Sequence, residues 1–363
     1  MQSISPEIIF RGNDAWKKAL PRISKLIQSP LILGRSIHTE NLREILFRDL
    51  KNQNLNVNSD NLHFDCCYED ISRLKSIILE NNHDAVIAAG GGKVLDSGKY
   101  LAESLDIPCI TVPFSASTCA GWTALSNIYT KNGQFIKDVP LRSCPKVLVY
   151  DHKFIQTAPS RTLASGIADA LAKWYESSIT SSTIDDGFVQ QAIQISRVLR
   201  DQLLLQGEKA FKDPFENNSS WRNTIEACGL TAGLVGGIGG EKCRTAAAHA
   251  FHNAITQIIT PNKFLHGEIV GVGLLLQLRL EEMKNNNKLA DQSIKQLSTL
   301  MNQLDLPTTI SELGINVFEN QNLNTIADFT CRDKSEIHFL PFEINKQDII
   351  ELIVNFEQQK IKI

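Results

Sequence analysis

The stretch Asp84-Ala-Val-Ile-Ala-Ala-Gly-Gly-Gly-Lys-Val-Leu-Asp-Ser-Gly-Lys-Tyr-Leu-Ala-Glu-Ser104 joins an apolar run to three glycines and then to a helical pattern. The apolar run, residues 86–89, is typical of a parallel strand buried on both faces. Gly90, Gly91 and Gly92 predict a tight turn that a ligand can approach closely. A helix is expected from about Val94, with Asp96 in its first turn, so its free amide groups point at the turn and favour an anion such as a phosphate.

A plain turn is the alternative interpretation of this glycine cluster. The stretch matches neither G-x-G-x-x-G nor G-x-x-x-x-G-K-[ST], the two common nucleotide-binding patterns. Lys93, directly after the glycines, favours the phosphate interpretation, because a cation adds charge beside the turn.

The composition is that of an ordinary globular protein. The chain has 363 residues, a formal net charge of −3 and a hydrophobic fraction of 42%. This length favours two domains, and the charge balance gives no support to binding of nucleic acid or acidic lipid. The first residues lack a signal-peptide pattern, and no apolar run is long enough to cross a membrane, so we expect a cytoplasmic protein.

Eight cysteines are scattered along the chain, at positions 66, 67, 109, 119, 144, 228, 243 and 331. They form no C-x-x-C pair, and a chain of this size does not need disulfide bonds to fold. We expect reduced thiols.

The first half predicts alternating strands and helices. The expected helices are 14–27, 40–52, 69–82 and 94–104, and the expected strands are 30–35, 61–67, 86–89, 109–113 and 147–150. This alternation predicts a parallel sheet with helices on both faces. Ligands of such sheets bind at the carboxyl ends of the strands, where Arg35, the glycine turn and the loop 115–119 are expected to gather.

The second half has helical periodicity almost throughout, in the segments 161–180, 188–206, 223–237, 244–259, 268–285, 291–304 and 348–358. We therefore predict an α/β domain over residues 1–157 and an all-helical domain over residues 158–363. An active site is expected in the cleft between them.

Three polar residues, Asp169, His249 and His266, stand out in small and apolar helical surroundings. A carboxylate among alanines is costly unless it is paired or binds a metal. Two imidazoles and one carboxylate are a common set for a catalytic divalent metal. Taken singly, each residue is more often a core polar group with its own hydrogen bonds, so the residues alone leave both interpretations open.

Six motifs together resemble those of glycerol dehydrogenases, which belong to the metal-dependent (iron-containing) alcohol dehydrogenase superfamily. In chain order they are GGGKVLD from Gly90, PFSASTCA from Pro113, ALSNIYT from Ala124, GIADALAKWYE from Gly166, AAHAFHN from Ala247 and HGEIV from His266. The resemblance runs in order from about residue 8 to the C-terminus.

This resemblance implies a dehydroquinate synthase-like architecture, in which an N-terminal dinucleotide-binding domain precedes a helical one. It implies that Asp169, His249 and His266 bind a divalent metal. Iron-type members carry a further histidine four residues after the aspartate, where this chain has Lys173, so zinc is favoured and iron is the alternative. The implied cofactor-binding residues are Arg35, Gly90, Gly91, Gly92, Lys93, Asp96, Ser115, Ser117, Thr118, Thr123, Leu125 and Tyr129.

Three departures from the family pattern bear on specificity. The aspartate that contacts glycerol hydroxyls is replaced by Cys119, a poor acceptor for polyol hydroxyls, so we expect a substrate other than glycerol. Phe114 replaces a threonine near the cofactor. Arg35 stands where NAD-using members carry an aspartate, and a guanidinium there can bind a 2′-phosphate, so we expect NADP(H) to be used at least as well as NAD(H).

The resemblance implies an NAD(P)-linked oxidoreductase that interconverts a small alcohol or polyol and its aldehyde or ketone, with the metal polarising the oxygen. We assign Cys119 to the substrate side, and His252 either relays a proton or is structural. The alternatives are a dehydroquinate synthase-like lyase and a non-catalytic nucleotide-binding module. We further expect a homo-oligomer with no nucleic-acid or membrane partner.

Overall fold

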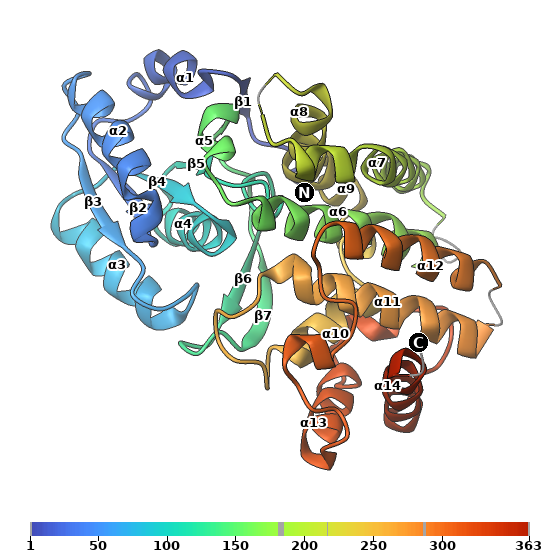
Figure 1. Cartoon of the computed structure of the whole chain (residues 1–363). Helices are drawn as coiled ribbons and strands as arrows, with labels where there is room; N and C mark the ends of the chain where they lie inside the picture. The colour runs from blue at the N-terminus through green and yellow to red at the C-terminus, as the bar shows by residue number, and fades with distance from the viewer. Residues whose placement is uncertain (1, 181–184, 216, 286–287, 362–363) are drawn as a thin grey trace.

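The computed structural model describes residues 2–180, 185–215, 217–285 and 288–361. Its first half is a sheet covered by helices and its second half is a group of packed helices (Figure 1). This arrangement agrees with the predicted fold class.

The strands are β1 (Ile8–Gly12), β2 (Pro30–Gly34), β3 (Asn58–Asn61), β4 (Ala85–Gly90), β5 (Cys109–Pro113), β6 (Leu125–Tyr129), β7 (Phe135–Pro140) and β8 (Val147–Asp151). The helices of the first half are α1 (Ala15–Ile23), α2 (Glu40–Lys51), α3 (Tyr68–Glu80), α4 (Gly92–Leu105) and α5 (His152–Gln156). Those of the second half are α6 (Ser160–Thr180), α7 (Gly187–Lys212), α8 (Ser219–Glu226), α9 (Ala232–Gly239), α10 (Ala247–Ile255), α11 (His266–Asn285), α12 (Lys288–Gln303), α13 (Asn320–Thr330) and α14 (Lys346–Ile361).

Six strands form a parallel sheet in the order β1-β8-β5-β4-β2-β3. Successive side chains of a strand point to opposite faces, and both faces of the central strands are apolar. Ile32 and Ile87 pack with α1, α2 and α5 on one face, whereas Leu33 and Val86 pack with α3 and α4 on the other. Burial on both faces explains why these strands are uninterrupted apolar runs.

The glycine turn follows the middle of this sheet. Strand β4 ends at Gly90, and α4 begins at Gly92, with Gly91 in an extended conformation between them. Helix α4 lies close to its own strand because Gly98 has no side chain: a Cβ there would be 2.4 Å from the Cβ of Ala88. The predicted strand, turn and helix are confirmed.

Strand β1 and helix α5 were not expected, and two further differences from the expected elements lie in the first half. The expected strand 61–67 is wrong: β3 is Asn58–Asn61, a polar edge strand that pairs only with β2 and therefore has no apolar pattern. The antiparallel hairpin β6-β7 was not expected, and its own small core contains Cys66, Ile128, Tyr129 and Phe135.

The helical half agrees with the expected segments, with three differences. The expected helix 223–237 is two helices, α8 and α9, joined by a π-helical turn over Ala227–Thr231. Gly229 in this turn lies against Tyr150 of β8, whose hydroxyl donates to the carbonyl of Ile225 at 2.6 Å. The expected helix 244–259 is shorter, and helix α13 was not expected.

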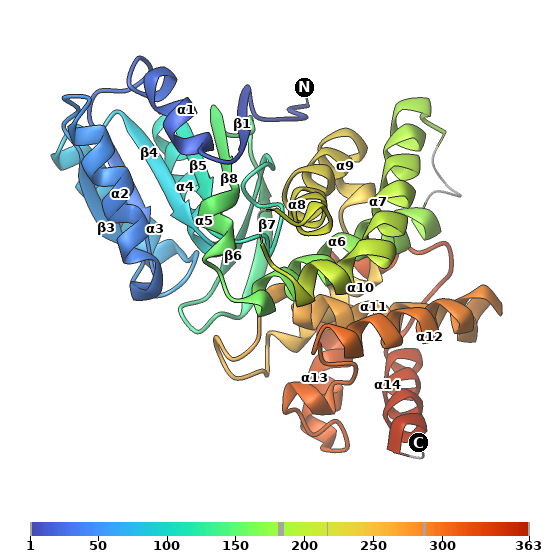
Figure 2. The same ribbon diagram turned by 45° about the horizontal axis from the view of Figure 1, so that its top comes forward.

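The two halves share one hydrophobic core. Ala116, Trp122 and Tyr150 of the α/β half belong to the same buried cluster as α6, α10 and α11. Figure 2 shows these helices beside the end of the sheet that carries β8 and the hairpin. The domain boundary near residue 157 stays a prediction, and its surroundings are continuous packing rather than an open linker.

Candidate active site

A cavity of about 480 Å³ lies between the two halves. It is lined by all three predicted metal ligands, by Cys119 and by every predicted cofactor-binding residue: Arg35, Gly90, Gly91, Gly92, Lys93, Asp96, Ser115, Ser117, Thr118, Thr123, Leu125 and Tyr129. The structure therefore gathers residues from both halves of the chain in one cleft.

No helix of the described residues is long and apolar enough to span a membrane.

One end of the cavity is the glycine turn with its cations. Lys93 forms an ion pair with the buried Asp65. Lys93 Nζ and Arg35 Nη2 each lie 3.3 Å from the same atom, Oδ1 of Asn262 in the helical half. One amide oxygen thus holds two cations together beside the glycine turn.

The loop after β5 covers the glycine turn. A Cβ on Gly92 would be 2.9 Å from the Cγ2 of Thr118, so the loop and the turn are in close contact. The hydroxyl oxygens of Ser115 and Ser117 are 3.0 Å apart. Helix α6 approaches the loop because Gly166 has no side chain, since a Cβ there would be 1.8 Å from the carbonyl oxygen of Ala116.

A buried lysine on α4 orders the next segment. Lys99 pairs with Asp96 at 3.0 Å and donates to the carbonyl and the hydroxyl of Thr123 and to the carbonyl of Leu125. Asp96 also accepts from the amide of Asn127 at 3.2 Å. Asp96 and Thr123 therefore reach the cavity wall through an internal network that fixes the β6 strand against α4.

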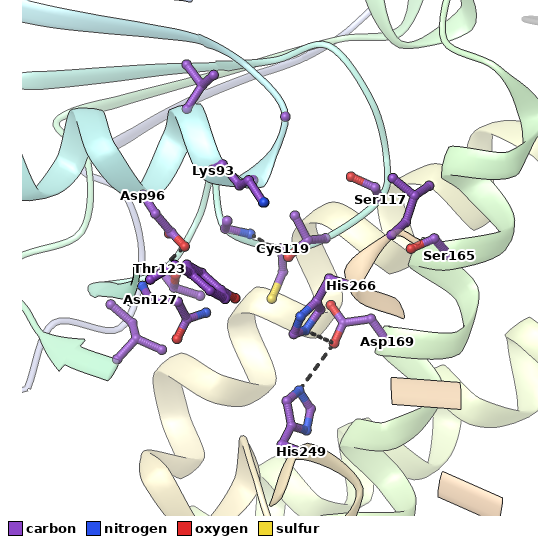
Figure 3. Close-up of a pocket in the computed structure, with 18 of the residues that line it drawn as sticks. Lys93, Asp96, Ser117, Cys119, Thr123, Asn127, Ser165, Asp169, His249 and His266 are labelled. Atoms are coloured by element: carbon purple, nitrogen blue, oxygen red, sulfur yellow. Dashed lines mark hydrogen bonds and ion pairs between the residues drawn. The ribbon is translucent and has the colours of Figure 1, made fainter. Parts of the chain in front are cut away.

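The predicted metal ligands converge at the other end (Figure 3). Oδ1 of Asp169 lies 3.5 Å from Nε2 of His249 and 3.7 Å from Nε2 of His266. The three ligand atoms all lie within 4.8 Å of one another. Asp169 Oδ1 is buried and has no hydrogen-bond partner among the described residues. A buried carboxylate oxygen that makes no hydrogen bond and faces two imidazole nitrogens fits a divalent metal.

The charges around Asp169 keep it ionised. Burial alone would raise the pKa of Asp169, but Lys173 and the two histidines outweigh it and hold this pKa well below its usual value. The Lys173 ammonium is 3.6 Å from Oδ1. The carboxylate is therefore in the form that binds a metal.

Glu176, one helical turn beyond Lys173, positions His249. Its Oε2 is 2.7 Å from Nδ1 of His249, and its Oε1 accepts from the backbone amides of Ala246 and His249 at 2.6 and 3.0 Å. The carboxylate both caps the start of α10 and accepts a hydrogen bond from Nδ1 of His249, so the ring is oriented with Nε2 towards Asp169.

His266 is the first residue of α11, and close helix packing places it. Its neighbour Gly267 donates to the hydroxyl of Ser165 on α6 at 3.0 Å. A Cβ on Gly267 would be 1.8 Å from the carbonyl oxygen of Ser165, so only glycine permits this approach. The start of α11 is thereby held at Ser165, which lies one turn of α6 before Asp169.

His252 lies behind His266 and does not line the cavity. Its Nε2 is 2.9 Å from Nδ1 of His266, and its Nδ1 is 2.9 Å from Oδ1 of Asn253. Asn253 in turn donates to Glu336 at 3.3 Å. If Nε2 of His266 binds the metal, Nδ1 of His266 donates to Nε2 of His252, and His252 is a neutral acceptor. Burial, followed by the nearby His266, holds the pKa of His252 well below its usual value. A proton-relay role for His252 stays a prediction.

Cys119 and Lys173 form the wall beside the ligands. The Cys119 sulfur points towards His266 and Asp169 in Figure 3. Burial raises the pKa of this thiol to about 11, so it is uncharged at neutral pH. Lys173 is buried and donates to the carbonyl of Arg244 at 3.2 Å.

Sequence reasoning missed Glu176, Asn253, Asn262 and Glu336. Glu176 was visible as a carboxylate seven residues after Asp169, which is two helical turns and hence the same face. Asn262 and Glu336 gave no such signal, because only the fold brings a loop and a short helical turn to the cleft.

Comparison with known proteins identifies the family. Residues 6–152 match the model of the family described as iron-containing alcohol dehydrogenase. The chain is 39% identical to an uncharacterised oxidoreductase of Synechocystis, over 97% of this chain and 91% of that protein. It is 33% identical to hydroxycarboxylate dehydrogenase A of Escherichia coli, over 76% and 75% of the two chains.

A crystal structure of glycerol dehydrogenase from Schizosaccharomyces pombe has the same fold. It superposes with a TM-score of 0.84 at 28% identity, covering 99% of this chain and 91% of that one. The match over both halves agrees with the resemblance expected from the motifs and with an oxidoreductase rather than a lyase. The chain belongs to the iron-containing alcohol dehydrogenase family, and it is a glycerol dehydrogenase-like, metal-dependent, NAD(P)-linked alcohol oxidoreductase.

Proposed function

We propose that this protein is a zinc-dependent oxidoreductase that accepts NADP(H) and interconverts a small hydroxy compound other than glycerol with its carbonyl form. The observation that carries the proposal is the position of Asp169, His249 and His266 in the cavity that also contains the glycine turn. Hydride exchange needs the cofactor and the reacting oxygen side by side, and this cleft offers both sites.

A bound divalent metal supplies polarisation of the hydroxyl or carbonyl oxygen, and the nicotinamide supplies the hydride exchange. The protein supplies the alignment. Glu176 and Ser165 fix the two ligand helices from behind. The loop 115–119 covers the glycine turn, and its Cys119 lines the same cavity, where we assign it to the substrate side.

Zinc is favoured by the ligand set. Two imidazoles and one carboxylate leave an open position in a tetrahedral site, as catalytic zinc requires. Lys173 stands where a fourth protein ligand of the iron type is expected, and an ammonium is not a ligand. Iron remains the alternative metal.

NADP(H) is favoured by Arg35 and Lys93. Their shared contact with Asn262, which brings both cations beside the glycine turn, supports this proposal. No acidic side chain at the end of β2 opposes a 2′-phosphate, because Gly34 and Arg35 occupy that place. A guanidinium can hold the phosphate through charge-assisted hydrogen bonds.

The substrate proposal rests on Cys119, which replaces a polyol-binding carboxylate with an uncharged thiol. Relatives of this chain bear the names glycerol dehydrogenase and hydroxycarboxylate dehydrogenase, so substrates differ within the family. We also propose that the protein works in the cytoplasm as a homo-oligomer.

The experiment is a rate assay with the purified protein. Nicotinamide absorbance is followed with NADP(H) and NAD(H) against a panel of polyols, aldehydes and ketones, before and after removal of metal by a chelator. We expect activity that is lost with the metal and restored by zinc. The proposal is wrong if no substrate is turned over with either cofactor, or if glycerol has the highest kcat/KM.

A further inference from the structure

The Lys173 ammonium is the starting observation. The side chain is only 6% exposed, yet it lines the cavity, 3.6 Å from Oδ1 of Asp169. Its one hydrogen bond among the described residues goes to the carbonyl of Arg244 at 3.2 Å. Asp169 is the sole carboxylate within ion-pair distance of Lys173 in the described part of the chain.

This arrangement is balanced only while Asp169 carries no metal. A divalent ion bound to Asp169, His249 and His266 takes up the carboxylate charge and leaves a buried ammonium beside a cation. A buried charge without a partner is strongly unfavourable. The loaded site therefore needs an anion from elsewhere, and the cavity is where one can enter.

No neighbouring carboxylate is placed to take over from Asp169. Glu176 also acts on Lys173, but both of its oxygens are engaged by Ala246 and His249. Cys119 lines the same cavity and offers a thiol where the glycerol dehydrogenase pattern has an aspartate. Arg244 also lines the cavity, and within the described ranges its guanidinium has no carboxylate at ion-pair distance. The further carboxylates that line the cavity belong to Asp96, Asp138, Glu241 and Glu336, and none of them is at ion-pair distance from Lys173 or Arg244 in the described part of the chain. Lys173 and Arg244 thus face the cavity with no paired carboxylate of their own once a metal occupies Asp169.

We propose that the substrate supplies the missing charge, as a carboxylate bound by Lys173 next to the reacting carbon. This inference rests on the proposed function and narrows its substrate class to 2-oxo acids and 2-hydroxy acids. In the reducing direction, the nicotinamide hydride adds to the carbonyl carbon of a 2-oxo acid and a proton adds to its oxygen. The products are the 2-hydroxy acid and the oxidised nicotinamide, so atoms and electrons balance.

A binding experiment tests this without turnover. The zinc affinity of the full chain is measured by competition with a fluorescent chelator, in the presence of isobutyrate or of its neutral isostere isobutyramide. We expect isobutyrate, but not isobutyramide, to raise zinc affinity roughly fivefold or more, because two ligands that relieve each other's repulsion bind cooperatively. Lys173→Met should bind zinc more tightly than the native chain and lose the isobutyrate effect. Lys295→Met, on the exposed face of α12, is the control and should behave like the native chain.

A rate experiment uses the matched pair 2-oxobutyrate and 1-hydroxy-2-butanone. The ratio of their kcat/KM values cancels any general loss of metal or folded protein. We expect the native ratio to favour the acid, and Lys173→Met to lower it roughly tenfold or more, since a buried charge-assisted contact is lost.

The outcomes separate this inference from the proposed function. Zinc binding with no effect of isobutyrate, or a ratio unchanged in Lys173→Met, overturns the carboxylate site and leaves the oxidoreductase proposal standing. A preference for dihydroxyacetone phosphate over 2-oxobutyrate also overturns it, in favour of a phosphate. Absence of zinc binding, or of turnover of any carbonyl compound, counts against the proposed function itself.

Discussion

Oε2 of Glu176 lies 2.7 Å from Nδ1 of His249, while the other oxygen of the same carboxylate caps the helix on which His249 stands. The ring and the helix are therefore oriented by one buried group. A partner of this kind raises the basicity of a ligating histidine and fixes its tautomer.

Replacing this carboxylate tests its role. Glu176→Gln keeps the shape but removes the charge that accepts the Nδ1 proton, so we expect zinc affinity to fall about 10- to 100-fold. The measurement is a zinc titration with a competing chelator. Glu357→Gln is a matched control, because Glu357 is equally buried and accepts from Ile310 and Ser311, away from the cleft. Equal zinc affinity in Glu176→Gln and the native chain would contradict the assignment.

The cofactor proposal predicts the effect of Arg35→Asp. The change removes a cation that can hold a 2′-phosphate and introduces a charge that repels it. We expect the preference, measured as kcat/KM for NADP(H) over NAD(H), to shift about tenfold or more towards NAD(H). A native enzyme that strongly prefers NAD(H) would refute the role of Arg35. Arg48→Asp, on α2, is a surface control for the loss of one arginine.

Cys119→Asp restores the carboxylate that the family resemblance implies at this position. We expect glycerol oxidation to rise, because a carboxylate accepts hydrogen bonds from polyol hydroxyls. We also expect the ratio of 2-oxobutyrate to 1-hydroxy-2-butanone turnover to fall, because the new anion compensates Lys173. Cys119→Ser, which is uncharged, should do neither. Unchanged kcat/KM for glycerol in Cys119→Asp would show that residue 119 does not contact the substrate.

Helix packing at Gly166 predicts a stability effect. A Cβ there would be 1.8 Å from the backbone oxygen of Ala116, so Gly166→Ala must shift α6 or the loop. We expect the free energy of unfolding to fall by about 1 to 3 kcal/mol. Gly187→Ala, where nothing lies within 4 Å of the new Cβ, should be neutral or slightly stabilising. Urea denaturation of both variants measures the difference.

Glu226 gives a pH-dependent contact between the halves. It lies 3.0 Å from His152 of α5 and also pairs with Arg11. Burial alone would raise its pKa, but these two partners outweigh it and lower the pKa below the usual 4.5. Its stabilisation is therefore complete above about pH 4.5 and is lost as pH falls through the lower, folded-state pKa.

Glu226→Gln should accordingly cost about 1 kcal/mol near neutral pH, a modest value because solvent partly screens the pair. The difference in free energy of unfolding between this variant and the native chain should shrink in acid. A difference that is constant from pH 7 to pH 3 would contradict the lowered pKa.

Much of the fold could be predicted because buried strands and helices have characteristic patterns of apolar residues. The central strands are apolar on both faces, so β2, β4 and β5 could be placed from the sequence, while the polar edge strand β3 could not. The π-helical turn at Gly229 depends on Tyr150, which is distant in sequence, and no local pattern announces it.

The site shows the same limit. Asp169, His249 and His266 were found through apolar surroundings and family motifs, and the structure brings their ligand atoms together. The contacts of Asn262 with Arg35 and Lys93, and of His252 with His266, arise only after the halves pack. A single sequence contains no periodicity that links residues 35, 93 and 262.

The core shared by the two halves also sets how the molecule can move. Beside β8, the halves are joined by Trp122 and Tyr150, and Ile4 ties the N-terminal segment to both Trp122 and Gly237. A hinge motion there would expose apolar surface, at a free-energy cost of about 25 cal/mol for each Å² exposed. The contacts of Asn262 with Arg35 and Lys93, in contrast, are two hydrogen bonds that water can replace. We therefore expect the cleft to open near Asn262 to admit the dinucleotide, while the packing around Tyr150 stays fixed.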